Sequence, residues 1–140
     1  MNILLIEDND VDALILERML KKHSPSATLV RACDGQEALE LLTTERGRDL
    51  PRPFFILLDI NMPRMNGHEF LDELRAREEI SDNIVYMFTT SDSPHDITRA
   101  YHRNISSYIV KPSSSAGTKK VLNALQEMWD VCTPPHCATA

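Results

Sequence analysis

Five short apolar runs, separated by segments with a helical spacing of apolar residues, are the feature that most constrains the fold of this 140-residue chain. The run at 54–59, Phe-Phe-Ile-Leu-Leu-Asp, shows no polar alternation, which is typical of a parallel strand buried on both faces. The other strands are expected at 3–6, 27–32, 84–88 and 107–110. Helices that join parallel strands must cover both faces of the sheet. We therefore predict an α/β fold, with a five-stranded parallel sheet in a doubly wound (βα)5 sandwich.

The segments between the runs carry apolar residues three or four positions apart, as amphipathic helices do. Asp10 is a plausible N-cap of the first helix, and Ser93-Pro94 begins the fourth. The second helix is expected at 36–44, with Ala38, Leu41 and Leu42 facing inward. A third should follow Asn66-Gly67, and the last is expected at about 116–130.

The composition excludes several classes of function. A net charge of -6 without a Lys/Arg cluster argues against nucleic-acid binding. Neither a membrane-spanning apolar stretch nor a signal peptide is evident, and three cysteines are typical of reduced thiols. We expect a cytoplasmic protein with one domain at 1–131, a short tail at 132–140 and no output domain. Cys132, His136 and Cys137 lack a fourth ligand, so no zinc site is expected.

Polar residues stand where four of the predicted strands end. Glu7-Asp8 follows the first, Asp59 ends the third, Thr89 follows the fourth, and Lys111 follows the fifth. The carboxyl ends of parallel strands meet at one edge of a sheet, where ligands bind in such folds. Three carboxylates in one small volume either take up protons or bind a cation, and hard oxygen ligands favour Mg²⁺ or Mn²⁺.

The same edge would hold groups suited to phosphoryl transfer. Asp59 is the candidate nucleophile because it ends the most buried strand, with the Lys111 ammonium and the Thr89 hydroxyl nearby. Each residue alone has a simpler explanation: Asp59 as a turn residue, Glu7-Asp8 as a helix-terminal charge pair, Lys111 as a surface lysine. Their joint placement at strand ends favours a single site.

With these residues in place, the chain resembles the receiver domain of two-component response regulators, the CheY-like superfamily with a flavodoxin-like fold. The narrower likeness is to stand-alone response regulators associated with phytochromes. The resemblance covers residues 3 to about 129 and rests on four segments. These are Leu5-Ile6-Glu7-Asp8-Asn9, Leu57-Leu58-Asp59-Ile60-Asn61-Met62-Pro63 with Asn66-Gly67, Phe88-Thr89-Thr90-Ser91, and Tyr108-Ile109-Val110-Lys111-Pro112.

The resemblance implies that Asp59 accepts a phosphoryl group from a histidine kinase, possibly of the phytochrome type. It implies Mg²⁺ held by Asp8, Asp59 and the Asn61 backbone carbonyl, with Glu7 acting through water. Lys111 would pair with the acyl phosphate. It further implies a cis Lys111–Pro112 bond.

The likeness also implies a switch, in which Thr89 moves to the phosphoryl group and Tyr108 turns inward. A protein target, not identified by the sequence, or a second copy of the chain would then bind the surface of the fourth helix, fifth strand and fifth helix. The small Ser113-Ser114-Ser115 run predicts a loose start of the last helix.

Two alternatives stay open at this stage. One is a phosphorylation-independent adaptor of the same fold, which the intact set of strand-end residues disfavours. The other is a Mg²⁺-dependent phosphatase with an aspartyl-phosphate intermediate. Such a phosphatase needs a second carboxylate two residues after its nucleophile to act as acid and base. Here that residue is Asn61, whose amide cannot do so.

Overall fold

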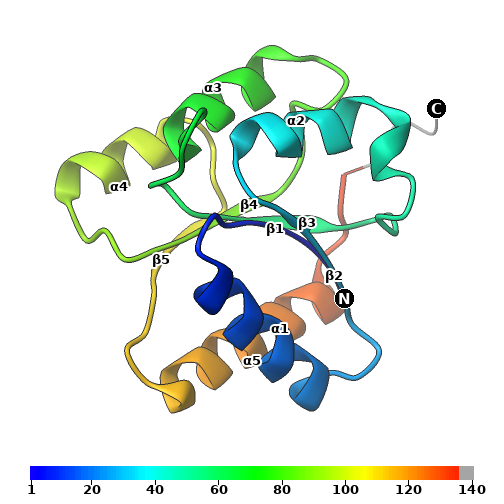
Figure 1. Cartoon of the computed structure of the whole chain (residues 1–140), viewed down its shortest axis with the longest axis vertical. Coiled ribbons are helices and arrows are strands. Elements are labelled where there is room, and N and C mark those ends of the chain that lie inside the picture. The colour runs from blue at the N-terminus through cyan, green and yellow to red at the C-terminus, as the bar shows by residue number, and fades with distance from the viewer. Residues whose placement is uncertain (136–140) are drawn as a thin grey trace.

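The computed structural model describes residues 1–135, and it confirms the predicted architecture (Figure 1). One sheet of five parallel strands has the order β2-β1-β3-β4-β5. The strands are β1 (Asn2–Ile6), β2 (Thr28–Ala32), β3 (Phe55–Leu58), β4 (Val85–Thr89) and β5 (Ser107–Val110). The helices are α1 (Asp10–His23), α2 (Gly35–Thr43), α3 (Gly67–Ala76), α4 (Pro94–Tyr101) and α5 (Ser115–Val131), with a 3₁₀ turn, η1 (Glu45–Gly47).

The helices form two layers on either side of the sheet. Helices α2, α3 and α4 cover one face, and α1 and α5 cover the other (Figure 1). Alternate residues of each strand therefore enter two different cores: Leu4 and Ile56 pack with α2 and α3, whereas Leu5 and Leu57 pack with α1 and α5. This double burial explains why the central strands are continuously apolar.

The strand at 55–58 lies in the middle of the sheet, as its unbroken apolar pattern indicates. All four of its residues are buried, and it pairs with β1 on one side and β4 on the other. Strand β2 lies at an edge, and four of its five residues are only partly buried. The most buried strand therefore delivers Asp59 to the centre of the carboxyl edge of the sheet.

Helix starts differ from the sequence predictions in two places. The N-cap of α1 is Asn9, one residue earlier than expected, and its side chain accepts a hydrogen bond from Asp12 N at 2.9 Å. Helix α5 has a defined start, because Ser114 Oγ accepts a hydrogen bond from Gly117 N at 3.0 Å. The serine run therefore supplies a cap, which is the role that a short hydroxyl side chain fills best at such a position.

Two further expectations need correction. Helix α2 buries Ala38, Leu39 and Leu42, whereas Leu41 is only partly buried where it packs against the same core. The cis proline bond among the described residues is Arg52–Pro53, and Lys111–Pro112 is trans, the isomer that X–Pro bonds prefer intrinsically.

Arg75, on α3, holds together the loops at the amino end of the sheet. Its guanidinium donates four hydrogen bonds, of 2.6 to 3.0 Å, to backbone carbonyls. Two of these belong to the loop before β4, at Ser81 and Asn83, and two to the segment before β5, at Arg103 and Asn104. One half-buried side chain thus satisfies carbonyl groups that would otherwise lack partners.

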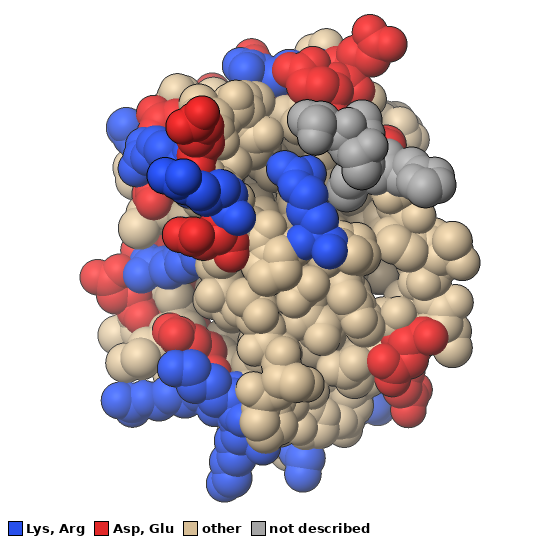
Figure 2. All heavy atoms as spheres, turned by 90° about the vertical axis from the view of Figure 1, so that its right-hand side faces the viewer, with Lys and Arg blue, Asp and Glu red and all other residues tan. Residues whose placement is uncertain are grey.

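The side of the molecule where the N-terminus lies carries few charges at its centre. Figure 2 shows a broad uncharged area on this side, with Lys, Arg, Asp and Glu gathered around its margin. Trp129 of α5 packs against Phe55 of β3, with ring centroids 6.0 Å apart. Among the described residues, no helix combines the length and the apolar character needed to cross a bilayer. His136 and Cys137, considered above as metal ligands, lie outside the described residues.

Candidate functional site

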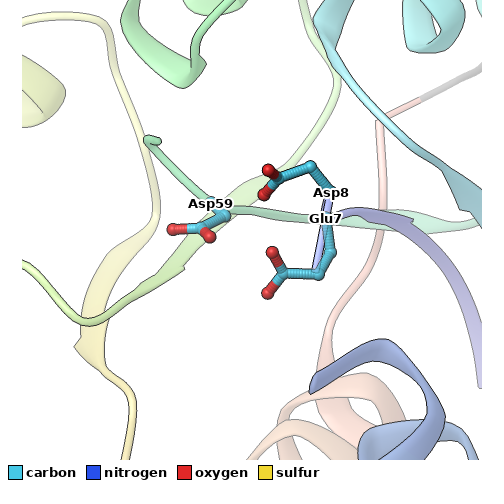
Figure 3. A group of neighbouring side chains, drawn as sticks. All are labelled: Glu7, Asp8 and Asp59. Atoms are coloured by element: carbon cyan, nitrogen blue, oxygen red, sulfur yellow. The ribbon is translucent and has the colours of Figure 1, made fainter. Parts of the chain in front are cut away.

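Three carboxylates converge at the carboxyl edge of the sheet. Glu7 and Asp8 follow β1, and Asp59 follows β3, its neighbour in the sheet. Each can offer an oxygen atom such that all three atoms lie within 4.8 Å of one another. Figure 3 shows the side chains reaching into the same space, with Glu7 and Asp59 buried and Asp8 exposed. The cluster therefore combines a buried floor with an opening to solvent.

The backbone of the sheet sets this geometry. Asp59 N donates to the carbonyl of Ile6 at 3.1 Å, and Glu7 N donates to the carbonyl of Ala32 at 3.0 Å, so the ladder extends through both acids. The start of α3 lies directly behind Asp59. A Cβ atom on Gly67 would stand 2.4 Å from the Asp59 carbonyl oxygen, and this close approach requires glycine.

Lys111 reaches across the sheet to the same carboxylates. Its Nζ forms ion pairs with Glu7, with Asp12 Oδ2 at 3.0 Å and with Asp59 Oδ2 at 3.4 Å. Burial alone would lower the pKa of Lys111, but the hydrogen bond that Lys111 donates to Glu7 and the charge of Asp59 outweigh it and raise that pKa above its usual range. The ammonium is therefore a permanent positive charge at the centre of the site.

One cation does not neutralise the acids around it. Burial, together with the neighbouring Asp59, raises the pKa of Glu7 to about 7, even though its hydrogen bond with Lys111 acts in the opposite direction. Like charges this close repel one another strongly unless a proton or a cation intervenes. The donors are hard carboxylate oxygens, which suit Mg²⁺ or Mn²⁺ rather than zinc. The residues present therefore fit a small divalent cation.

Thr89 and Tyr108 meet at the loop between β4 and α4 rather than at the acids. Thr89 is fully buried, and its Oγ1 accepts a hydrogen bond from Ser91 N at 3.4 Å. The Tyr108 hydroxyl donates to the Ser91 carbonyl at 2.9 Å. Asn61 is exposed, two residues beyond Asp59. The structure thus brings Glu7, Asp8, Asp59 and Lys111 into one cluster. Thr89 and Tyr108 instead contact Ser91 in the loop between β4 and α4.

Two side chains that border the site were not predicted from the sequence. Asp12 reaches Lys111 from the first turn of α1, and Arg31 on β2 donates to the Glu7 carbonyl at 2.9 Å while pairing with Asp10 at 2.8 Å. Arg31 thereby holds the acidic loop in place. An arginine near the end of β2 is the signal that could have identified it, because a strand next to β1 brings its last residues beside Glu7.

Residues 3–123 match the family model of the response regulator receiver domain. Among curated proteins, the chain is 32% identical over 127 residues to the probable methanogenesis regulatory protein FilR2 of Methanothrix harundinacea. That alignment covers 91% of this chain and 82% of FilR2.

Solved structures of the same fold are also similar. Response regulator RPA3017, from red light signalling in R. palustris, is 33% identical with a TM-score of 0.84, and the match covers 95% of this chain and 96% of that one. The Mn²⁺-bound form of Rcp1 is 28% identical with a TM-score of 0.81, covering 95% and 97% of the two chains. Rcp1 is a response regulator of Synechocystis. The fold is thus that of receiver domains, a flavodoxin-like sandwich.

Proposed function

This chain belongs to the response regulator receiver domain family, and we propose that it accepts a phosphoryl group on Asp59 from a histidine kinase, with Mg²⁺ as cofactor. The observation that carries the proposal is the position of Asp59. Its carboxylate ends the central strand, is buried, and faces both the Lys111 ammonium and two further carboxylates. Members of this family serve as signalling switches, and the geometry fits a switch that is set by covalent charge.

In the proposed reaction an Asp59 oxygen attacks phosphorus as the phosphorus–nitrogen bond to the kinase histidine breaks, and the electron pair of that bond returns to the imidazole. Asp8, Asp59 and the Asn61 backbone carbonyl would hold Mg²⁺, with Glu7 acting through water. When bound, the metal neutralises charge on the transferring phosphoryl oxygens. Lys111 lies 3.4 Å from Asp59 Oδ2, close enough to stabilise the same oxygens from the protein side.

Two relatives support a proposal for the upstream partner. RPA3017 acts in red light signalling, and another similar structure is that of a phosphorylated cyanobacterial phytochrome response regulator, RcpA, at 28% identity and a TM-score of 0.83. We propose a phytochrome-type histidine kinase as the phosphoryl donor. The exchange would take place in the cytoplasm, where such a kinase draws on ATP.

The output would be a contact surface rather than a chemical product. Thr89 would leave Ser91 to bond a phosphoryl oxygen, and Tyr108, now half-buried, would turn further inward. Tyr108 lies on β5 and contacts Tyr101 of α4, and Thr89 pairs with Val110 of β5. We propose that a downstream protein or a second copy of the chain binds the surface of α4, β5 and α5.

Intact-mass measurement after incubation with acetyl phosphate and Mg²⁺ tests the central step. The parent should gain one phosphoryl mass, and chelation of Mg²⁺ should abolish the gain. Asp59→Asn should gain nothing, whereas Asp34→Asn, a matched change of a buried aspartate outside the site, should label as the parent does.

An unlabelled parent, or equal labelling of Asp59→Asn, contradicts the proposal. An unlabelled parent that still binds its partner would favour the adaptor alternative. Turnover of a phosphomonoester would favour the phosphatase.

A further inference from the structure

His68 is a buried histidine that the proposed chemistry does not use. It follows Gly67 in the first turn of α3, and only 3% of its surface is exposed. Its Nε2 lies 3.0 Å from Asp96 Oδ1, in the first turn of α4. Its Nδ1 has no hydrogen-bond partner among the described residues. An apolar side chain would fill this space without burying an unpaired nitrogen, so the contact with Asp96 is what histidine adds.

Asp96 also contacts Ser91, in the loop between β4 and α4. Its Oδ2 accepts a hydrogen bond from Ser91 Oγ at 2.6 Å. The hydrogen bond from Ser91, and after it the one from His68, hold the pKa of Asp96 below the ordinary range of a carboxyl group. The carboxylate is therefore ionised near neutral pH and can only accept hydrogen bonds. His68 must then carry its proton on Nε2 and act as the donor.

Ser91 is the residue on which both switch residues converge. Its backbone N–H donates to Thr89 Oγ1 at 3.4 Å, and its carbonyl accepts from the Tyr108 hydroxyl at 2.9 Å. The proposed movement of Thr89 toward a phosphoryl group on Asp59 would break its contact with Ser91. The third contact of Ser91, through Asp96, ties this loop to α3, the helix that begins directly behind Asp59.

We propose that His68 and Asp96 are positioning residues that anchor the loop between β4 and α4 in its place before phosphorylation, and so set how readily the switch turns. The inference rests on the proposed phosphorylation of Asp59. A contact made in one of two conformations shifts their equilibrium by its own free energy. The loss of one hydrogen bond to a charged group corresponds to a shift on the order of tenfold.

Titration with beryllofluoride and Mg²⁺, a mimic of the aspartyl phosphate, tests the anchor. The backbone amides of Thr89 and Ser91 serve as NMR reporters. His68→Leu and Asp96→Ala should bind the mimic about tenfold more tightly, because less free energy opposes the loop movement. His68→Gln places an amide donor near the position of Nε2 and should remain within about twofold of the parent. Asp92→Ala, an exposed carboxylate of the same loop, is the matched control and should leave the affinity unchanged.

A second measurement follows the histidine itself, first in the unmodified protein and then with the mimic bound. In the unmodified protein, a long-range proton–nitrogen spectrum should show His68 protonated at Nε2, and its Nε2 signal should shift when beryllofluoride binds. Thermal unfolding of each variant shows whether it folds. Asp96→Ala keeps the anchor testable if His68→Leu does not fold, because Asp96 is partly exposed.

The anchor is overturned if His68→Leu and Asp96→Ala bind the mimic as the parent does, or more weakly. It is equally overturned if His68→Gln behaves like His68→Leu. A parent that does not bind beryllofluoride at all is a different result, because it counts against phosphorylation of Asp59 itself.

Discussion

Lys111 and Arg75 are two half-buried cations at opposite ends of the same sheet, and their partners differ in kind. Lys111, at the carboxyl end, faces three carboxylates that compete for it: Glu7, Asp12 and Asp59. Arg75, at the amino end, donates to four backbone carbonyls that have no charge and cannot leave. The first arrangement can exchange partners, whereas the second cannot.

The difference separates function from stability within one small domain. Carbonyl groups need a donor in every state of the folded chain, so Arg75 acts as a fixed connection between loops. Carboxylates can exchange an ammonium for a metal ion or a proton, and burial together with the neighbouring Asp59 raises the pKa of Glu7 at this edge. We therefore expect substitutions at the amino end to cost stability, and those at the carboxyl end to cost reactivity.

Arg75→Met should have the largest effect on folding. It leaves four carbonyls in the loops before β4 and β5 without their charged donor, and we expect a loss of about 3 kcal/mol in the free energy of unfolding. Urea denaturation measures the loss. Arg75→Lys keeps the positive charge but loses the planar set of donors. Its free energy of unfolding should lie between those of the parent and of Arg75→Met. Phosphoryl uptake by folded Arg75→Met should match that of the parent. If Arg75→Met is as stable as the parent, Arg75 is not the stabilising connection between loops that we infer.

Lys111→Met should show the reverse pattern. The rate of phosphoryl uptake from acetyl phosphate should fall about 100-fold, because the transition state loses a charged donor beside Asp59. With Mg²⁺ present, the fold should be retained, as circular dichroism can show. Lys111→Arg, which keeps the charge with a different geometry, should be intermediate. Uptake at the parental rate in Lys111→Met would show that the ammonium is structural after all.

Asp34→Ala tests a buried acid whose partners are complete. Asp34 caps α2 by accepting from Glu37 N at 2.9 Å, and Arg64 Nε donates to it at 2.7 Å. Loss of the cap should lower the free energy of unfolding by about 1 kcal/mol. Asp34→Asn keeps an amide oxygen as the cap and should lose less.

The Asp34 contribution should depend on pH in a defined direction. Burial opposes ionisation of Asp34, but the hydrogen bonds from Arg64 and Glu37 outweigh burial and lower its pKa. A lowered pKa in the folded state contributes stability above the unfolded value, near pH 4, and this contribution is lost as pH falls through the folded value. The gap between parent and Asp34→Asn should therefore narrow when urea denaturation is repeated at acidic pH. A constant gap would argue against the ion pair.

Asp59→Asn should change stability as little as Asp34→Ala does, but with the opposite sign. Without metal, the substitution removes one of three crowded carboxylates and should raise the free energy of unfolding by about 1 kcal/mol. Asn can still accept the hydrogen bond that Ile60 N gives to Asp59 Oδ1 at 2.8 Å. Saturating Mg²⁺ should stabilise the parent more than the variant, reducing or reversing the difference. Differential scanning calorimetry with and without Mg²⁺ can measure this, and a destabilised metal-free variant would contradict the repulsion.

Much of the fold could be predicted from the apolar pattern, because burial on both faces leaves strands such as 55–58 with no polar residue. The convergence of Glu7, Asp8, Asp59 and Lys111 was predictable as well, because parallel strands end at one edge. The errors were local: the cap of α1 is Asn9 rather than Asp10, and Ser114 orders the start of α5. Side-chain capping depends on dihedral angles that a pattern of residue types does not encode.

The sequence by itself determined the succession of strands and helices along the chain, the two-sided core and the acidic edge of the sheet. Each of these follows from periodicity and chain direction. Only the tertiary structure decided which side chains from separate elements meet. His68 and Asp96 are 28 residues apart, and nothing in their spacing shows that the first turns of α3 and α4 bring them within 3.0 Å. Arg31 and Asp12 likewise join the site through helix and strand positions set by packing. Contacts between elements depend on how layers pack, and that information lies in three dimensions rather than along the chain.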